Sequence, residues 1–340
     1  MGAAAVLAGL GGWVPGDAVG NAELARHLHL DDEWIRTRTG ISQRHLVAAG
    51  QSTGDLAVEA CRRALDSYGA GPVDALVLAT ATPDQPCPPT APQIAAALGL
   101  GPVPAFDVGA VCSGFVYGLA TGAGLLAAGV AGTVLVAGAD AFSTIVDPED
   151  RKTRSVFGDG AGAVVLRAGR AAEPGVIGGF DLGSDGTEHG LLVVPGGGSR
   201  QRSTGEGIKS EDCYLVMDGP RLFSRAVQRM AESVARTAAR VGWDIAGVNR
   251  FVLHQANERI LAAVARRLGV PRERFVCNIG RVGNTAAASI PLALADAAGR
   301  GELQPGHRVL LSGFGGGLTW GSAALIWPGL GPIAPIAATP

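Results

Sequence analysis

The chain has 340 residues, a formal net charge of −2 and charged side chains at only 17% of its positions. That length allows one large compact unit or two fused halves. The near-neutral charge balance excludes a nucleic-acid-binding surface or an acidic tail as the basis of its function. The 52 glycines fall at turns and helix starts, which is typical of α/β enzymes whose backbone approaches a ligand closely.

Six short apolar segments predict central strands of a sheet, and alanine-rich helical stretches alternate with them. Residues 73–78 resemble residues 248–253, and residues 134–138 resemble residues 309–313, so both pairs share an offset of 175 positions. This repeat predicts an α/β fold with two similar halves, each built around a layered sheet. The predicted strands are residues 76–79, 134–137, 163–166, 251–253, 309–312 and 323–326.

Composition also sets the expected limits of the two halves. We place the first half at residues 1–172 and the second at residues 173–327. Within the second half, residues 184–211 are rich in Gly, Ser and charge, which predicts a long surface excursion. Residues 328–340 are rich in Pro, Gly and Ala, which predicts a flexible tail.

A stretch without charge raises the question of a membrane. No charged residue occurs between Asp107 and Asp140, and that length could span a bilayer. Glycines at positions 114, 118, 122, 124, 129 and 132 interrupt the stretch, however, and residues 133–137 have the pattern of a separate strand. A buried helix followed by a buried parallel strand explains it better, so we expect no membrane span.

The five cysteines indicate the compartment. They are odd in number, and their spacing matches neither a disulfide framework nor a metal site. Residues 1–10 also lack the basic segment of a secretory signal. We therefore expect a protein of the reducing cytoplasm without a bound metal. The cysteines are Cys61, Cys87, Cys112, Cys213 and Cys277.

Cys112 is the most informative of them, because an extended segment ends just before it and a glycine-rich helical stretch begins just after it. A thiol in the first turn of a helix faces unpaired N–H groups and the positive end of the helix dipole, which favour the thiolate. A lone cysteine is more often a small buried apolar residue. Two further segments, His254-Gln255-Ala256-Asn257 and Gly283-Asn284-Thr285, also place polar side chains after apolar runs. Cys112, His254 and Asn284 thus indicate one active site.

Six motifs occur in order along the chain and together resemble the β-ketoacyl-[acyl carrier protein] synthase III family of the thiolase superfamily. The motifs are residues 33–41, 112–115, 157–162, 254–257, 283–285 and 313–317. The resemblance implies a five-layered α-β-α-β-α fold with two pseudo-symmetric halves. It also implies an acyltransferase that initiates fatty acid synthesis or primes an aromatic polyketide, with no metal or organic cofactor.

The implied reaction is a decarboxylating Claisen condensation. Cys112 would take an acyl group from acyl-CoA as a thioester. His254 and Asn284 would stabilise the enolate formed when malonyl-acyl carrier protein loses CO₂, which gives a β-ketoacyl-acyl carrier protein. By resemblance, the backbone N–H groups of Cys112 and Gly316 form the oxyanion hole. Phe314 would give an apolar wall that desolvates the malonyl carboxylate.

The resemblance also suggests substrate contacts. Trp34 and Arg151 would stack on the CoA adenine, and Arg38 and Asn257 would contact the nucleotide and the pantetheine arm. Cys87 would reach across a homodimer to the end of the partner's acyl pocket, and this small residue predicts starters longer or more branched than acetyl. Candidate pocket residues are Phe157, Met217 and Phe223, and candidate residues for docking an acyl carrier protein are Arg259, Arg266 and Arg267.

Other functions remain open at this point. A relative of the same fold could move an acyl group from Cys112 to a hydroxyl or amine without decarboxylation, although such enzymes typically alter the His or the Asn. A non-catalytic partner subunit would lack the nucleophile. A degradative thiolase needs a second catalytic cysteine late in the chain, and residues 315–326 contain none. Chalcone-synthase-like enzymes are longer and lack this His-Gln-Ala-Asn context.

Overall fold

The computed structural model describes residues 3–16, 18–69, 71–330, 333 and 336. Nine strands form one mixed sheet in the order β11-β12-β13-β8-β1-β7-β6-β4-β5. All six predicted strands lie within strands of this sheet. Its strands are β1 (Ala4–Trp13), β4 (Ala75–Ala79), β5 (Ala105–Val108), β6 (Thr133–Asp140), β7 (Gly160–Gly169), β8 (Val176–Ser184), β11 (Arg250–Leu253), β12 (Arg308–Gly315) and β13 (Thr319–Ile326).

The strand pairings repeat between the two halves of the chain. β4 runs parallel to β6 in the first half, and β11 runs parallel to β12 in the second. The registers correspond as well, because Ala75 pairs with Val134 and Arg250 pairs with Val309. β1 and β8 join the halves through a short antiparallel pairing. The internal repeat seen in the sequence is therefore a repeat of topology.

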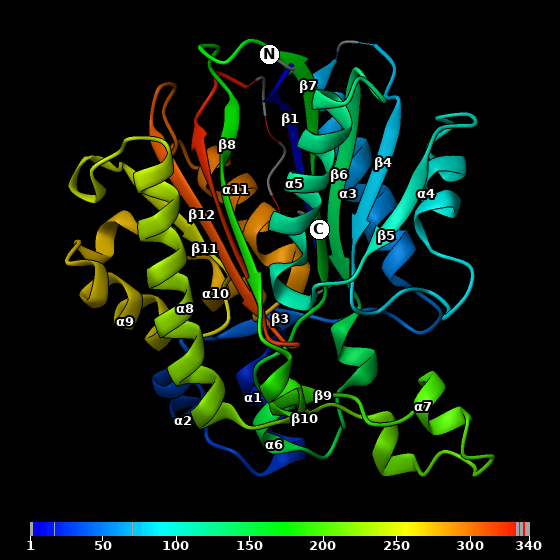
Figure 1. Cartoon of the computed structure of the whole chain (residues 1–340). Helices are drawn as coiled ribbons and strands as arrows, with labels where there is room; N and C mark the ends of the chain where they lie inside the picture. The colour runs from blue at the N-terminus through cyan, green and yellow to red at the C-terminus, as the bar shows by residue number, and fades with distance from the viewer. Residues whose placement is uncertain (1–2, 17, 70, 331–332, 334–335, 337–340) are drawn as a thin grey trace.

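Helices cover and separate the two halves of the sheet in five layers, α-β-α-β-α (Figure 1). α8 and α9 lie outside the second half, and α3 and α4 lie outside the first half. α5 and α11 fill the layer between them. The bounds are α3 (Thr53–Tyr68), α4 (Ala91–Ala97), α5 (Gly114–Ala127), α8 (Gly219–Arg240), α9 (Glu258–Leu268) and α11 (Ser289–Gly299).

The uncharged stretch forms α5 and β6 in this central region. Gly118 and Gly122 of α5 face Val136 of β6 so closely that an added Cβ would lie 3.0 Å from its methyl groups. Close packing of helix on strand, rather than lipid, accounts for the absence of charge. No helix in the described part of the chain is long and apolar enough to cross a membrane.

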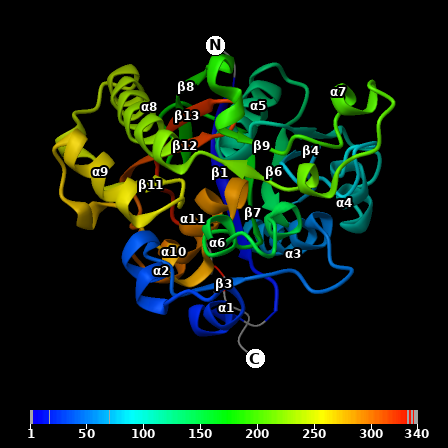
Figure 2. The same cartoon turned by 90° about the horizontal axis from the view of Figure 1, so that it is seen from below.

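Shorter elements gather at one end of the layers, at the bottom of Figure 1 and facing the viewer in Figure 2. α7 stands away from the layers in both views. The short elements are β2 (Ala18–Gly20), α1 (Asn21–Leu28), α2 (Asp32–Thr39), β3 (Gln43–His45), α6 (Arg151–Arg154), β9 (Leu192–Val193), α7 (Ser199–Arg202), β10 (Val216–Met217) and α10 (Ile279–Val282).

The predicted surface excursion and the predicted tail each contain at least one buried residue. Most of residues 198–211 are exposed, but Leu191 at the start of the excursion is buried. The predicted excursion is thus anchored by an apolar residue before it leaves the surface. Much of residues 328–340 lies outside the described residues. Of those described, Ile333 packs against the core and Ile336 is buried in it.

Candidate active site

Cys112 lies in a strained turn between β5 and α5. A short 3₁₀ helix (Val111–Ser113) leads into α5, and Val111 has φ of +45°, which is unusual for a β-branched residue. The Ser113 Oγ lies 2.8 Å from the Thr319 Oγ1, and Thr319 Oγ1 donates to the Ala110 carbonyl at 3.0 Å. β13, from the other half of the chain, therefore holds the turn in place.

Glycines at the end of β12 allow the backbone to lie directly against this turn. A Cβ on Gly315 would lie 2.7 Å from the Cys112 backbone nitrogen, and one on Gly313 would lie 2.9 Å from the Ser113 Cα. Only glycine fits at such distances. Gly316 follows and lines the same pocket as Cys112.

His254 follows β11 and is 3% exposed. Its backbone N–H donates to the Ser312 carbonyl of β12 at 2.8 Å, and its Nδ1 lies 2.6 Å from the Ser289 Oγ. Burial lowers the pKa of His254 to about 3. The ring is therefore neutral near pH 7 and carries one N–H donor.

Asn284 is held by a loop from the first half of the chain. Its backbone N–H donates to the Val156 carbonyl at 2.9 Å, and its carbonyl accepts from the Gly158 N–H at 3.0 Å. Its side-chain Oδ1 accepts from the Ala286 N–H at 3.0 Å. Since the oxygen is occupied, the amide nitrogen is the group that Asn284 offers to the pocket.

Asp140 is a buried residue that the sequence analysis did not single out. It ends β6 and is inaccessible to solvent. Its carboxylate accepts from the Ala81 N–H at 2.7 Å and from the Ala287 N–H at 2.8 Å. Burial raises its pKa to about 6, although these hydrogen bonds lower it. Asp140 thus ties the loop after Asn284 to the loop after β4.

Burial also changes the pKa of Cys112, the candidate nucleophile. It raises the pKa of the Cys112 thiol, and the Asp140 carboxylate raises it further. The start of α5 favours the thiolate, as expected from the sequence, but desolvation acts against it. A neutral thiol thus lies in the same pocket as a neutral imidazole, without an ion pair.

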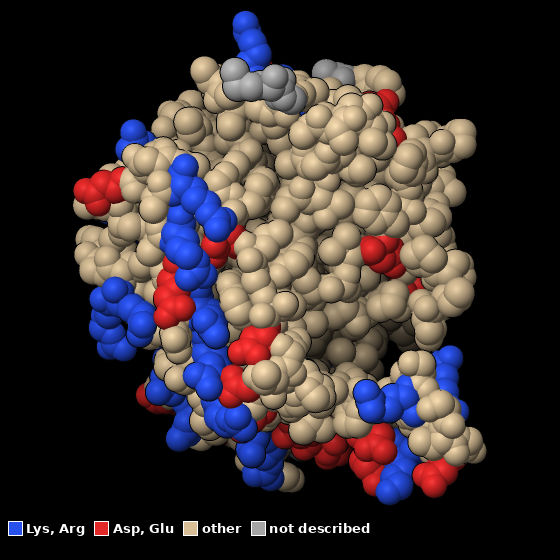
Figure 3. Space-filling model, in the orientation of Figure 1, with Lys and Arg blue, Asp and Glu red and all other residues tan. Residues whose placement is uncertain are grey.

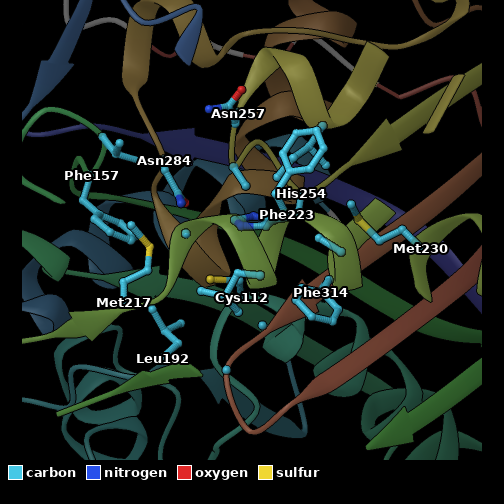
Figure 4. Close-up of a pocket in the computed structure, with 18 residues that line it drawn as sticks. Cys112, Phe157, Leu192, Met217, Phe223, Met230, His254, Asn257, Asn284 and Phe314 are labelled. Carbon is cyan, nitrogen blue, oxygen red and sulfur yellow. The ribbon is translucent and has the colours of Figure 1, made fainter. Parts of the chain in front are cut away.

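One mainly apolar pocket joins these three groups (Figure 4). In Figure 4, Phe157, Met217 and Leu192 lie on one side of Cys112, and Phe314 and Met230 lie on the other. Phe223 and Asn257 also line it. Ala256 and Gly315, which line it too, belong to the motifs found in the sequence, whereas the sequence analysis did not identify the following lining residues: Val156, Leu192, Gly219, Leu222, Ala226, Met230 and Ile260.

Spacing along α8 could have revealed part of this wall. Gly219, Phe223, Ala226 and Met230 recur at three- and four-residue intervals, which places them on one face of a helix. Leu192 has no comparable signal, because it belongs to the excursion that composition assigns to the surface.

The predicted nucleotide contacts lie outside the pocket. Trp34 is 36% exposed, and the Arg38 guanidinium lies 4.4 Å from its ring centroid. Asn257 Nδ2 donates to the Arg38 carbonyl at 3.0 Å, which joins α2 to the pocket wall. Arg151 is exposed on α6. Stacking of Trp34 and Arg151 on an adenine remains a prediction.

The other predicted residues lie on the surface. Cys87 is exposed in the loop between β4 and α4, and it does not line the pocket of its own chain. Arg259, Arg266 and Arg267 are exposed on α9. Arg259 lies closest to the pocket, with its guanidinium 5.9 Å from the Phe223 ring centroid.

Comparisons with known proteins show the family of the chain. Family models described as 3-oxoacyl-[acyl-carrier-protein (ACP)] synthase III match residues 106–186 and, for its C-terminal part, residues 238–327. β-Ketoacyl-[acyl-carrier-protein] synthase III 3 of Streptomyces coelicolor is 57% identical over 97% of this chain and 99% of that protein. The chain belongs to the β-ketoacyl-[acyl carrier protein] synthase III family.

Solved structures of synthase III proteins share the whole architecture. The structure of 3-oxoacyl-(acyl carrier protein) synthase III from Pseudomonas aeruginosa superimposes with a TM-score of 0.91 at 50% identity, covering 97% of this chain and 100% of that one. The priming β-ketosynthase of the R1128 polyketide pathway has a TM-score of 0.88 at 32% identity, covering 96% and 97%. The family resemblance and the thiolase-like fold predicted from the motifs are confirmed.

The buried neutral His254 gives this synthase a specific pH dependence of stability. In the unfolded chain a histidine titrates near pH 6.5, whereas folding lowers the pKa of His254 to about 3. Between these values the unfolded state binds more protons, so stability falls as the pH falls. From pH 7 to pH 5 the free energy of unfolding should drop by about 2 kcal/mol more in the wild type than in His254→Asn.

Urea unfolding at both pH values measures this difference. His189→Asn, which changes an exposed histidine, is the matched control and should behave like the wild type. Equal pH dependence in the wild type and His254→Asn would contradict the assignment of a buried neutral ring.

Proposed function

We propose that this protein catalyses the decarboxylating condensation of an acyl-CoA starter with malonyl-acyl carrier protein. In the first step the Cys112 sulfur forms a bond to the acyl carbonyl carbon as the bond from that carbon to the CoA sulfur breaks. The thiol proton passes, on balance, to the released CoA thiol. Cys112 and Gly316 line the pocket, and their backbone N–H groups would stabilise the tetrahedral oxyanion.

In the second step a malonyl thioester enters beside the acyl-Cys112. Its carboxylate leaves as CO₂, and the electron pair of the broken C–C bond becomes an enolate. The enolate carbon then attacks the acyl carbonyl, and the Cys112 sulfur leaves and takes up a proton. The reaction needs hydrogen-bond donors at the enolate oxygen and an apolar setting for the carboxylate.

The observation that carries the proposal is the pair of neutral donors beside the nucleophile. Burial holds His254 uncharged, and the hydrogen bond to Ala286 leaves the Asn284 amide nitrogen free for a ligand. Two such donors suit an enolate that exists only during decarboxylation. The side chains present provide the nucleophile, the donors and the apolar wall, so the proposed reaction calls on no metal or organic cofactor.

Each half of the reaction can be tested separately by intact-protein mass spectrometry. An acyl-CoA should add one acyl mass to the wild type and none to Cys112→Ala. His254→Ala and Asn284→Ala should still load, but malonyl-acyl carrier protein should discharge them about 100- to 1,000-fold more slowly, because each change removes one oxyanion donor. Asn249→Ala, at an exposed asparagine outside the site, is the matched control.

The outcomes separate the two catalytic functions. Wild-type protein that loads but cannot be discharged by malonyl-acyl carrier protein would favour transfer of the acyl group to a hydroxyl or amine. Absence of loading from every acyl-CoA would contradict the catalytic assignment of Cys112.

We further propose that the carrier protein docks on α9. Figure 3 shows Lys and Arg side chains along the α8 and α9 side of the molecule. The α8 arginines are largely neutralised, because Asp181 pairs with Arg236 and Glu188 pairs with Arg225. In the described part of the chain, Arg259 and Arg266 have no acidic partner within 4 Å. These uncompensated charges near the pocket suit an acidic carrier protein.

Charge reversal on α9 should therefore weaken use of the carrier protein without damaging the site. Arg259→Glu and Arg266→Glu should each raise KM for malonyl-acyl carrier protein about 5- to 10-fold. Loading from acyl-CoA should be unchanged for Arg266→Glu, which lies farther from the pocket. Arg62→Glu, on the opposite outer helix α3, is the control, and an equal effect there would exclude specific docking on α9.

We propose that the protein forms a homodimer through the β5 edge of the sheet, the edge opposite β11. β5 is a terminal strand with no neighbour on one side in the described structure, and unpaired edges favour association. The face over α5 is uncharged, and an acidic cluster lies over β5 (Figure 3). The exposed Cys87 loop precedes α4, which contacts β5, so the loop lies near this edge. Dimerisation here could bring Cys87 to the partner's acyl pocket.

This arrangement makes the starter preference depend on residue 87. Cys87→Phe should shift the preference among acyl-CoA starters toward shorter chains, because a bulky ring would occupy the end of the partner's pocket. Cys87→Ser keeps the side chain small and should preserve the wild-type profile. Competition among straight and branched acyl-CoAs, read as acyl masses on Cys112, gives the profile. An unchanged profile in Cys87→Phe would contradict this role.

We also infer a cytoplasmic location. All five cysteines are free in the structure, as expected in a reducing compartment. Acyl-CoA and malonyl-acyl carrier protein, the proposed substrates, would have to be present in the same compartment. Fractionation of cells expressing the protein would test the location.

A further inference from the structure

The imidazole of His254 has a single hydrogen-bond partner in the described part of the chain, the hydroxyl of Ser289. The Nδ1 and Oγ atoms are 2.6 Å apart. Ser289 is the first residue of α11 and is 1% exposed. It lies outside the motifs that indicate the catalytic residues, and the reaction steps above assign it no task.

The direction of this hydrogen bond follows from the partners of the hydroxyl. The Gln255 backbone N–H points to the Ser289 Oγ at 3.4 Å, so the oxygen already accepts one contact. Among the described residues, His254 Nδ1 is the sole acceptor recorded for the hydroxyl proton. A buried hydroxyl donates its proton when an acceptor is within reach. Ser289 therefore donates, and Nδ1 accepts.

The direction fixes the state of the ring. A neutral imidazole carries one proton on one of its two nitrogens. When Nδ1 accepts a hydrogen bond, the proton resides on Nε2, because the bond at one nitrogen selects the tautomer. Nε2–H then remains available to a ligand in the pocket that His254 lines.

We propose that Ser289 is a positioning residue that holds His254 as an Nε2–H donor for the enolate oxygen. This inference rests on the proposed condensation. In the opposite tautomer an Nε2 lone pair would face the enolate oxygen, and two lone pairs would repel. Loading of Cys112 uses the oxyanion hole instead, so Ser289 should matter for decarboxylation and not for loading.

The kinetic test compares Ser289→Ala with Ser289→Thr. Ser289→Ala should load Cys112 from acyl-CoA within about twofold of the wild type, while decarboxylation of malonyl-acyl carrier protein falls about 10- to 100-fold, the effect of one or two hydrogen bonds in a transition state. Ser289→Thr keeps the hydroxyl and should recover most of that loss. Ser322→Ala, which removes another buried serine hydroxyl that bonds Ser312, controls for general damage to the core.

A spectroscopic test reads the tautomer directly. In protein labelled with ¹⁵N-histidine, the His254 signals are assigned by their loss in His254→Asn. The wild type should show a protonated Nε2 and an unprotonated Nδ1, and Ser289→Ala should shift both signals toward an average of the two tautomers. A protonated Nδ1 in the wild type would overturn the proposal, and so would unchanged signals in Ser289→Ala.

The two tests separate failure of this inference from failure of the proposed function. If the wild type does not decarboxylate malonyl-acyl carrier protein, the condensation is wrong, but the ¹⁵N signals still decide whether Ser289 sets the tautomer. If the wild type condenses and Ser289→Ala does so equally well, Ser289 has no positioning role. Equal losses in loading and decarboxylation would point to a structural role only.

Discussion

The close approach of two backbones is the contact on which the rest of the site depends. The turn that carries Cys112 lies against the end of β12, where glycine leaves no side chain between them. These segments come from the two halves of the chain, so Cys112, the proposed nucleophile, is positioned by packing between halves. A methyl group at Gly315 would push the turn away by more than the tolerance of a catalytic geometry. The strained Val111 and the hydrogen bonds of Ser113 and Thr319 maintain the contact.

Burial opposes charge on each of the ionisable groups around this contact. It opposes charge on the Cys112 thiol and the His254 imidazole. Asp140 is buried too, but hydrogen bonds from both halves of the chain stabilise its carboxylate. The site therefore has polarity without a formal charge at the reacting atoms. Such a setting favours reactions in which charge develops in the transition state and is met by fixed donors.

The two halves share a topology but contribute different chemistry. Asp140 ends β6, and Gly315 occupies the equivalent end of β12. One position carries a carboxylate that secures loops, whereas the other must be glycine to reach Cys112. Similarly, the turn before α5 holds Cys112, the proposed nucleophile, and the segment before α11 holds Asn284. The symmetry of the fold thus places two helix starts at one site, and local residues assign a separate role to each.

Local signals in the sequence were sufficient to predict most central strands, the two halves and three of the candidate site residues. Apolar segments of three or four residues identified the central strands, since buried strands lack charge. The repeat at 175 positions indicated two halves, and polar residues after apolar runs indicated Cys112, His254 and Asn284. The sequence did not predict β1 and β8, because their glycines weaken the strand pattern. The structure shows why two of these glycines, Gly9 and Gly11 of β1, are needed, since a Cβ on either would collide with the backbone of α3.

The sequence by itself determined which side chains could carry the chemistry, because nucleophiles, donors and turn glycines are properties of residue types and their neighbours. Only the tertiary structure decided their protonation and orientation. The neutral state of His254 and its contact with Ser289 depend on residues tens of positions away. Burial and hydrogen-bond direction arise when distant segments pack together, so no local pattern could reveal them.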